Sequence, residues 1–160
     1  MSLIITAGIQ ASDSIGSGPQ AIMQSVKGVS LESKYTRIVL SSNDNCRRCE
    51  QMLSDREYQR YSLVLRGLRV TMETDVVFWV VLNSKEGVLA DRSDPGYVGD
   101  FNFFGAESSP QSVSFQIGDV VQNLQARGRL ICPMSITFRS NNVVVRRGDA
   151  SIEHIQLWKY

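Results

Sequence analysis

The chain has 160 residues, of which 42% are hydrophobic and 21% charged, as in a single globular domain with a buried core. Because 17 Lys and Arg residues nearly balance 16 Asp and Glu residues, the composition excludes a general attraction to nucleic acid or an anionic membrane. The apolar runs fall short of the roughly 20 residues that span a bilayer. Three cysteines are an odd number, which argues against the disulfide framework of secreted proteins and predicts reduced thiols in the cytoplasm.

The first segment is predicted to be a flexible or irregular arm that covers residues 1–34. Residues 8–34 are rich in Gly, Ser and Gln, a composition typical of irregular structure. A single domain is expected over residues 35–160. It begins with a short β-branched strand at residues 37–40, which ends at the turn-forming residues 42–45.

Cys46 and Cys49 follow this turn and enclose two arginines on a predicted loop, with one or two helical turns expected over residues 50–57. Neighbouring guanidinium groups favour the thiolate form of a cysteine, and a pair of soft thiolates suits Cu(I) better than hard cations. Two thiolates do not complete a four-ligand zinc site, so we predict at most a transient two-coordinate metal site. Inert thiols or a local disulfide are equally compatible with this spacing.

Two strand patterns come next. Residues 61–72 alternate between apolar and polar side chains, and Gly67 inside this pattern marks a bulge. Residues 76–82 are apolar on both faces, which predicts a central strand that is buried on both sides. A loop is expected at residues 91–96.

An aromatic strand is predicted over residues 97–105. Alternation places Phe101 and Phe103 on one face of this strand, with Asn102 and Phe104 on the other. Most of these rings are expected in the core. One aromatic side chain left at the rim can fill the pocket of another protein.

One helix is predicted after this strand, because Asp119 and Gln122 resemble a capping box and Gly128 is a stop signal. Three further strands are predicted over residues 130–138, 142–146 and 150–158. Short strands at regular spacing with one short α-helix predict a mainly β fold, either an antiparallel β-sandwich or a barrel.

The other chemistry-bearing residues point to structural roles. Cys132 lies in an apolar strand pattern and is expected to be a small buried residue, and His154, the single histidine, is expected at the surface. The sequence holds no Gly-rich phosphate loop, Ser nucleophile elbow or HExxH motif. These observations favour an accessory or binding protein over an enzyme, and leave open acid–base catalysis by carboxylates that meet in space.

Three segments share their pattern with a known family. They are residues 63–68 leading into 77–83, the run Tyr97-Val98-Gly99-Asp100-Phe101-Asn102-Phe103-Phe104-Gly105, and residues 115–124 followed by 136–138 and 151–157. Together they resemble the β-sandwich domain that follows the type-3 copper domain in tyrosinases, polyphenol oxidases and molluscan haemocyanins. The resemblance covers roughly residues 60–160, and the aromatic run is its most specific part.

This resemblance implies a shielding domain. In that family the domain covers the entrance to the copper site and often places one bulky side chain in the substrate pocket. Some fungal members carry a CxxC implicated in copper loading, and Cys46 and Cys49 are similar to it in spacing, although they lie upstream of the matching strands. The type-3 copper site itself needs a set of histidines that a chain with one histidine cannot supply.

The first functional hypothesis follows from the resemblance. The chain would be an accessory domain that binds, shields or delivers copper to a separately encoded type-3 copper oxidase. Cys46 and Cys49 would hand over transient Cu(I), with no cofactor bound permanently. One aromatic residue would plug the partner's pocket, and the candidates for this plug or for a pocket are Trp79, Tyr97, Phe101, Phe103 and Phe104.

The second hypothesis belongs to a different class. The chain would be a small-molecule-binding β-barrel, or a cofactor-free cyclase or isomerase of secondary metabolism, with a pocket lined by Trp79, Tyr97, Phe101 and Phe103. A structural domain cut from a longer chain is a third interpretation. None of the three predicts a nucleic acid or a membrane as partner, and the sequence does not determine the oligomeric state.

Overall fold

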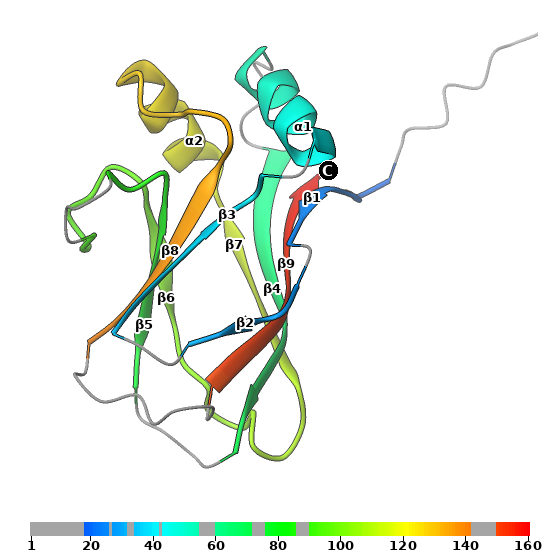
Figure 1. Cartoon of the computed structure of the whole chain (residues 1–160), viewed down its shortest axis with the longest axis vertical. Coiled ribbons are helices and arrows are strands. Elements are labelled where there is room, and N and C mark those ends of the chain that lie inside the picture. Colours follow the sequence, from blue (N-terminus) through cyan, green and yellow to red (C-terminus); the bar gives the residue numbers. More distant parts are fainter. Residues whose placement is uncertain are drawn as a thin grey trace, which may run out of the picture.

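The protein is described from a computed structural model, which covers residues 18–25, 27–31, 34–41, 43–54, 60–71, 76–85, 90–141 and 150–160. These residues form nine β-strands and two α-helices. The strands build two antiparallel sheets that stack as layers (Figure 1). The predicted antiparallel β-sandwich is therefore confirmed, with two helices instead of one.

Each sheet has a strand order that differs from the chain order. The first sheet contains β1 (Gln20–Gln24), β9 (Ala150–Lys159), β4 (Tyr61–Val70) and β7 (Gln111–Gln116), with β2 (Val29–Ser30) also paired to β9. The second sheet contains β3 (Tyr35–Val39), β8 (Ser135–Ser140), β5 (Phe78–Leu82) and β6 (Tyr97–Phe101). All of these neighbouring strands pair antiparallel.

The core lies between the two sheets, and four buried phenylalanine rings pack together in it. The ring centroids of Phe78 and Phe101 are 5.5 Å apart, and that of Phe103 lies 5.7 Å from Phe78. Phe138 closes the cluster at 6.0 Å from Phe101. Burial of each ring stabilises the fold by about 1.5–3 kcal/mol, and edge-to-face packing adds to this.

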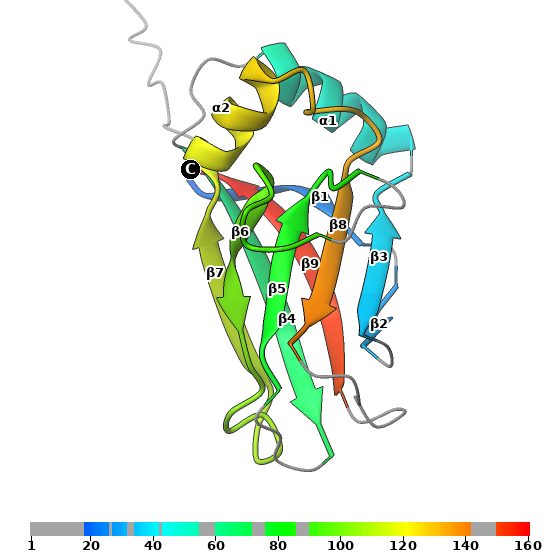
Figure 2. The same ribbon diagram turned by 90° about the vertical axis from the view of Figure 1, so that its left-hand side faces the viewer.

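Both helices lie at one end of the sandwich (Figure 2), and we call this the helical end: α1 (Asn43–Ser54) and α2 (Gly118–Ala126). α1 buries Asn45, Cys49 and Met52, whose spacing places them on one helical face. The Gln125 side chain of α2 donates a hydrogen bond to the Leu53 carbonyl of α1 at 2.7 Å. The connection between β6 and β7 lies at the opposite end.

The position of α1 corrects the sequence prediction. Cys46 and Cys49 lie inside this helix and not on a loop before it. The turn-forming residues Asn43 and Asp44 begin the helix, because Asn and Asp are favoured at helix N-termini as well as in turns. The acidic Asp44 in the first turn also suits the helix dipole.

The predicted arm also contains regular structure. β1 pairs with β9 from Gln20 onward, and Met23 of this strand is 2% exposed. The sandwich therefore begins before residue 35, because pairing with β9 outweighs the Gly- and Ser-rich composition. Residues 1–17 lie outside the described part of the chain.

Other local signals are borne out in part. Gly67 has φ 66° at a register shift of β4, as its bulge pattern predicts. Gly128 has φ 62° and ends α2, where its N–H donates to the Gln125 carbonyl and Arg129 N–H donates to Leu124. The predicted capping box is wrong, because the N-cap residue Ile117 makes no side-chain cap.

The last two points concern the strand predicted over residues 142–146 and membrane-spanning segments. The strand predicted over residues 142–146 falls outside the described residues. Among the described residues, no helix is both long and apolar enough to cross a membrane.

Candidate functional site

The turn between β6 and β7 presents an exposed aromatic side chain. Phe104 is 76% exposed, whereas its neighbour Phe103 is 0% exposed and packs in the phenylalanine cluster. The predicted alternation therefore continues past the end of β6 at Phe101. Leaving a phenylalanine in water forgoes roughly 1.5–3 kcal/mol of burial energy, so Phe104 contributes nothing comparable to the fold.

Hydrogen bonds within the turn hold Phe104 in place. Its N–H donates to the Asn102 side-chain oxygen at 3.2 Å, and Ala106 N–H donates to the Phe103 carbonyl at 2.9 Å. Gly105 follows with φ 77°, a conformation that favours glycine. The Gln111 side chain donates to the Gly105 carbonyl at 3.4 Å from the start of β7. The exposed ring is therefore carried by an ordered turn.

A shallow polar hollow lies beside this turn. It has a volume of about 310 Å³ and is lined by Arg69, Val70, Thr71, Ser151 and residues 106–110. An apolar side chain that projects next to a polar rim is the arrangement found in protein–protein interfaces. We call Phe104 with residues 102–111 the plug turn.

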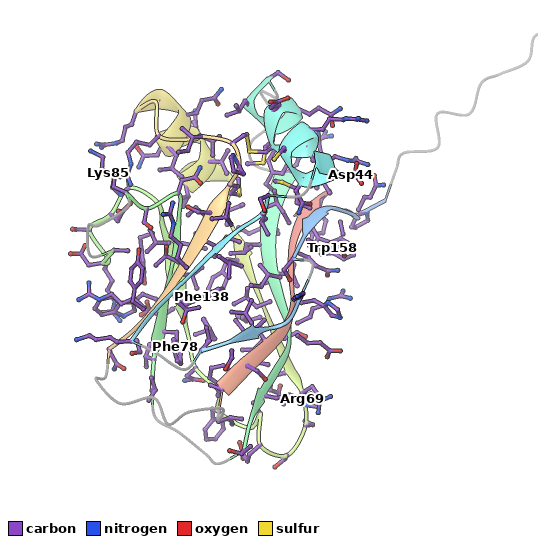
Figure 3. The ribbon with its side chains drawn as sticks, in the orientation of Figure 1. Asp44, Arg69, Phe78, Lys85, Phe138 and Trp158 are labelled. Carbon is purple, nitrogen blue, oxygen red and sulfur yellow. A yellow bond between two sulfur atoms is a disulfide. The ribbon has the colours of Figure 1, made fainter. Side chains whose placement is uncertain are left out.

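The three cysteines lie at the helical end. Cys49 of α1 forms a disulfide with Cys132, which precedes β8, and the sulfur–sulfur bond is drawn in Figure 3. Cys49 is 1% exposed, whereas Cys132 is half-buried. Cys46 is a free, half-buried thiol three residues before Cys49 on the same helix. The prediction that Cys132 is only a small buried residue is therefore wrong, because it is half-buried and bonded to Cys49, and the inference of reduced thiols from the odd count is wrong as well.

The disulfide changes what the CxxC pair offers to a metal. A disulfide sulfur carries no thiolate charge, so Cys49 is not a ligand while it is bonded to Cys132. Among the described residues, no group of three or more His, Cys, Asp and Glu side chains is arranged to hold a metal ion. His154 lies exposed on β9, with its Nε2 3.7 Å from the Glu153 carboxylate.

The four aromatic residues predicted to line one pocket do not meet. Phe101 and Phe103 pack inside the core, 5.6 Å apart. Trp79 lies on the outer face of the second sheet, where the guanidinium carbons of Arg139 and Arg92 lie 4.9 and 5.4 Å from its ring centroid. The phenylalanine side of the predicted pocket is therefore filled core.

Tyr97 belongs to a polar group next to Trp79. Its hydroxyl donates to Asp100, which also forms an ion pair with Arg92. Burial raises the pKa of Tyr97, and the hydrogen bond to Asp100 raises it further. The hydrogen bond to Asp100, followed by its negative charge, raises the pKa of Arg92. Sequence reasoning missed Arg92 and Asp100, because the fold of the loop that brings Arg92 back to β6 is not visible in local patterns.

A second polar network fixes the segment that carries Cys132. The Asn83 side chain donates to the Ile131 carbonyl at 3.2 Å and accepts from Ser135 N–H at 2.8 Å. Arg129 donates to the Asn83 carbonyl at 3.2 Å and lies 3.2 Å from an Asp94 carboxylate oxygen. Ile131, which is 57% exposed, therefore projects from a well-anchored segment.

β4 runs from the helical end, which holds the cysteines, to the hollow beside the plug turn. Its length therefore measures the distance between the cysteines and Phe104. Its first residue, Tyr61, lines a surface hollow with Met52 of α1, and its last residue, Val70, lines the hollow beside the plug turn. A strand rises about 3.3 Å per residue, so the ten residues of β4 span roughly 30 Å. Phe104 and the cysteines therefore lie at opposite ends of the sandwich.

Comparisons of the sequence alone identify no relative. No family model matches the chain, and no curated protein matches its sequence. Comparison of the structure does find matches.

Polyphenol oxidases are among the matching structures. Recombinant latent aurone synthase, a polyphenol oxidase, matches with a TM-score of 0.54 and 15% identity over 81% of this chain and 24% of that chain. Latent apple tyrosinase matches with a TM-score of 0.52 and 11% identity over 86% of this chain and 27% of that chain. Identities this low show a shared fold, and the chain spans about a quarter of the proteins it matches. The resemblance to the β-sandwich of polyphenol oxidases and tyrosinases is thus confirmed at the level of the fold.

Proposed function

We propose that this protein is a shielding domain that binds a separately encoded type-3 copper oxidase and inserts Phe104 into the entrance of its substrate pocket. The observation that carries the proposal is the exposure of Phe104, at 76%, on an ordered turn of a sandwich that resembles the corresponding part of polyphenol oxidases. The function is binding and occlusion, and the chain needs no catalytic group of its own.

The plug turn suits this role because its backbone is already ordered before it binds a partner. Hydrogen bonds from Phe104, Ala106 and Gln111 already fix the backbone of the turn. Preorganisation lowers the entropy lost on association, and a single buried aromatic anchor can dominate the energy of an interface. Residues 106–110, which line the hollow and include Glu107, Ser108 and Ser109, follow the anchor in the same turn and supply polar groups for the rim of the interface.

The test is inhibition of a tyrosinase-like oxidase from the native host, prepared without a shielding segment of its own. Addition of the purified chain should slow diphenol oxidation and raise KM, because the ring competes with the substrate. Phe104→Ala should lose most of this inhibition, and Phe104→Leu should keep much of it. The proposal fails if the wild-type chain does not inhibit, or if Phe104→Ala inhibits equally well.

The chain offers a matched control. Ile131 is another exposed large apolar residue, and it lies at the helical end beside the disulfide. Ile131→Ala removes a similar exposed apolar surface far from the plug turn. Its inhibition should equal that of the wild type, so a loss in both variants would point to non-specific hydrophobic association.

Copper delivery by Cys46 and Cys49 is the second half of the proposal, and geometry separates it from shielding. The pair lies roughly 30 Å from the plug turn along β4, so one docked pose cannot serve both roles. The disulfide must also be opened before Cys49 can act as a thiolate ligand. Titration with Cu(I) should show binding after reduction by a dithiol and none before it. Equal binding by Cys46→Ser would contradict delivery by this pair.

The small-molecule-binding β-barrel and the cofactor-free cyclase or isomerase receive less support. Their proposed pocket required Trp79, Tyr97, Phe101 and Phe103 around one cavity, and two of these rings fill the core. The hollow that contains Tyr97 is an open one of about 380 Å³ between Arg92, residues 93–95 and α2.

The disulfide also bears on the cellular location of the protein. Disulfides persist in oxidising compartments and are rare in the reduced cytosol. The Cys49–Cys132 pair therefore argues against the cytoplasmic location that the cysteine count predicts. Fractionation of the native host followed by thiol alkylation separates the two cases, since a fully reduced pool in the cytosol would restore the original expectation.

A further inference from the structure

We propose that Cys46, Cys49 and Cys132 form an intramolecular thiol–disulfide exchange site with two alternative pairings. One pairing is the Cys49–Cys132 bond seen in the structure. The other is a Cys46–Cys49 bond within α1, which releases Cys132 as a thiol. The proposal is independent of the docking function, because it concerns only the helical end.

Cys49 has two cysteine neighbours whose Cα atoms lie within the range that disulfides span. Its Cα lies 5.9 Å from that of Cys132. The pitch and radius of an α-helix place the Cα atoms of residues i and i+3 about 5 Å apart, so Cys46 stands at a similar separation. Both values fall within the range of about 4.4–6.8 Å that disulfides span. The Cβ atoms of residues i and i+3 in a helix lie about 5–6 Å apart, beyond the roughly 3.5–4.5 Å that a disulfide spans, so formation of the second bond also needs local unwinding of α1 around Cys46.

Burial favours attack from within the molecule. Cys49 is 1% exposed, which shields its sulfur from external thiols. Cys46 lies at the half-buried edge of the same helical face, and Cys132 is also half-buried. The nucleophile and the leaving thiol both reach solvent, where protons exchange, while the central sulfur stays protected.

The exchange step needs no oxidant or reductant. The Cys46 thiol gives its proton to solvent, and its thiolate attacks the Cys49 sulfur. The Cys46–Cys49 bond forms as the Cys49–Cys132 bond breaks, and the electron pair leaves on the Cys132 sulfur. Cys132 then takes a proton from solvent, so the number of disulfides and thiols is unchanged.

The surroundings allow this change without loss of the fold. The segment before β8 is held independently of the disulfide, because Asn83 bonds to both Ile131 and Ser135. The helices keep their Gln125–Leu53 hydrogen bond. Exchange therefore releases the covalent link between α1 and β8 and presents a half-buried thiol at Cys132, beside the exposed Ile131.

Thiol trapping with peptide mass mapping tests the proposal. The oxidised full chain is held in a glutathione redox buffer at mildly alkaline pH, quenched with acid and alkylated. In the wild type, label should appear on Cys132 together with a Cys46–Cys49 linked peptide. Cys46→Ser is the control, and its Cys132 labelling should be several-fold lower. Equal labelling of Cys132 in the two proteins would overturn the proposal.

A second variant tests the alternative pairing directly. Cys132→Ser removes the partner of Cys49 and leaves Cys46 and Cys49 as the two remaining cysteines of the chain. In the same buffer this variant should form the Cys46–Cys49 bond, and its far-ultraviolet circular dichroism should match that of the wild type apart from the loss of about one helical turn in α1. Persistence of two free thiols in a protein with the native spectrum would contradict the proposal.

Discussion

The two ends of the sandwich differ in how they are held and in what they expose. At the helical end, a disulfide joins α1 to the segment before β8, and hydrogen bonds from Asn83 and Gln125 connect elements far apart in the sequence. At the opposite end, the plug turn is ordered by bonds among its own residues and exposes Phe104. The two ends therefore show that the long-range cross-links of this fold and its exposed aromatic side chain, Phe104, lie in different places and do not depend on the same contacts.

The separation assigns different chemistry to each end. An end that is covalently joined suits a conditional change, because breaking one bond alters the connection between two elements. An end that is locally ordered suits recognition, because its shape does not depend on the redox state of the distant cysteines. The largest expected effects test whether the exposed turn is really anchored in the core.

Phe103→Ala should have the largest effect on stability. It removes a ring that is 0% exposed within the phenylalanine cluster, so we expect unfolding free energy to fall by about 3–5 kcal/mol. Phe104→Ala, one residue away, should change it by about 0.5 kcal/mol or less. Urea denaturation followed by tryptophan fluorescence measures both. Similar losses in the two variants would show that Phe104 is structural and would remove the contrast between the ends.

Removal of the disulfide should come next in size. The double variant Cys49→Ser/Cys132→Ser opens a loop with a sequence separation of 83 residues, so we expect a loss of about 2–4 kcal/mol. Cys46→Ser is the matched control and should stay within about 0.5 kcal/mol of the wild type. Inhibition of the oxidase by the folded double variant should be unchanged, and its loss would show that the two ends are coupled.

Two glycines, one at each end of the sandwich, allow the ends to be compared by substitutions with the same expected loss of stability. Gly105 in the plug turn and Gly128 after α2 both have positive φ, and neither has a neighbour close enough to clash with an added Cβ. Alanine at either position should therefore cost about 1–2 kcal/mol of stability. Gly105→Ala alone should weaken oxidase inhibition, because it alone shifts the backbone beside Phe104. Equal inhibition by the two variants would indicate that turn geometry does not control binding.

Much of the exposed end was predictable from the sequence. Alternation along residues 97–105 places Phe103 inside and Phe104 outside, because the side-chain period of an extended chain is two. Gly67 in β4 and Gly128 at the helical end carry a similar local signal, since few other residues adopt positive φ without strain. These features depend on neighbouring residues alone.

The helical end was harder to predict, because its main features depend on tertiary structure. The partner of Cys49 lies 83 residues away, and only the fold brings α1 beside the segment before β8. Asn43 and Asp44 are compatible with both a turn and a helix start, and packing of Cys49 and Met52 favours the helix. β1 likewise depends on its pairing with β9.

The smallest expected effect concerns Tyr97, which lines a hollow with residues of α2 near the helical end. Burial and the hydrogen bond to Asp100 raise its pKa above the ordinary value of 10.0. A group whose pKa is raised by folding contributes stability below its unfolded pKa, and this contribution is lost as pH rises through the folded value. Wild-type stability should therefore fall more steeply above pH 10 than that of Tyr97→Phe.

Titration of tyrosinate absorbance checks this prediction, because the late part of the wild-type curve should be smaller by one tyrosine in Tyr97→Phe. Asp100→Asn should move that transition to lower pH, since the carboxylate charge is one cause of the raised pKa, but burial should keep it above the ordinary value. Coincident titration curves for the wild type and Tyr97→Phe would contradict the assignment.

Neither variant touches the plug turn, so both should inhibit the oxidase as the wild type does. A change in inhibition would show that polar contacts near the helical end reach the recognition surface, and the two ends would then have to be treated as one unit.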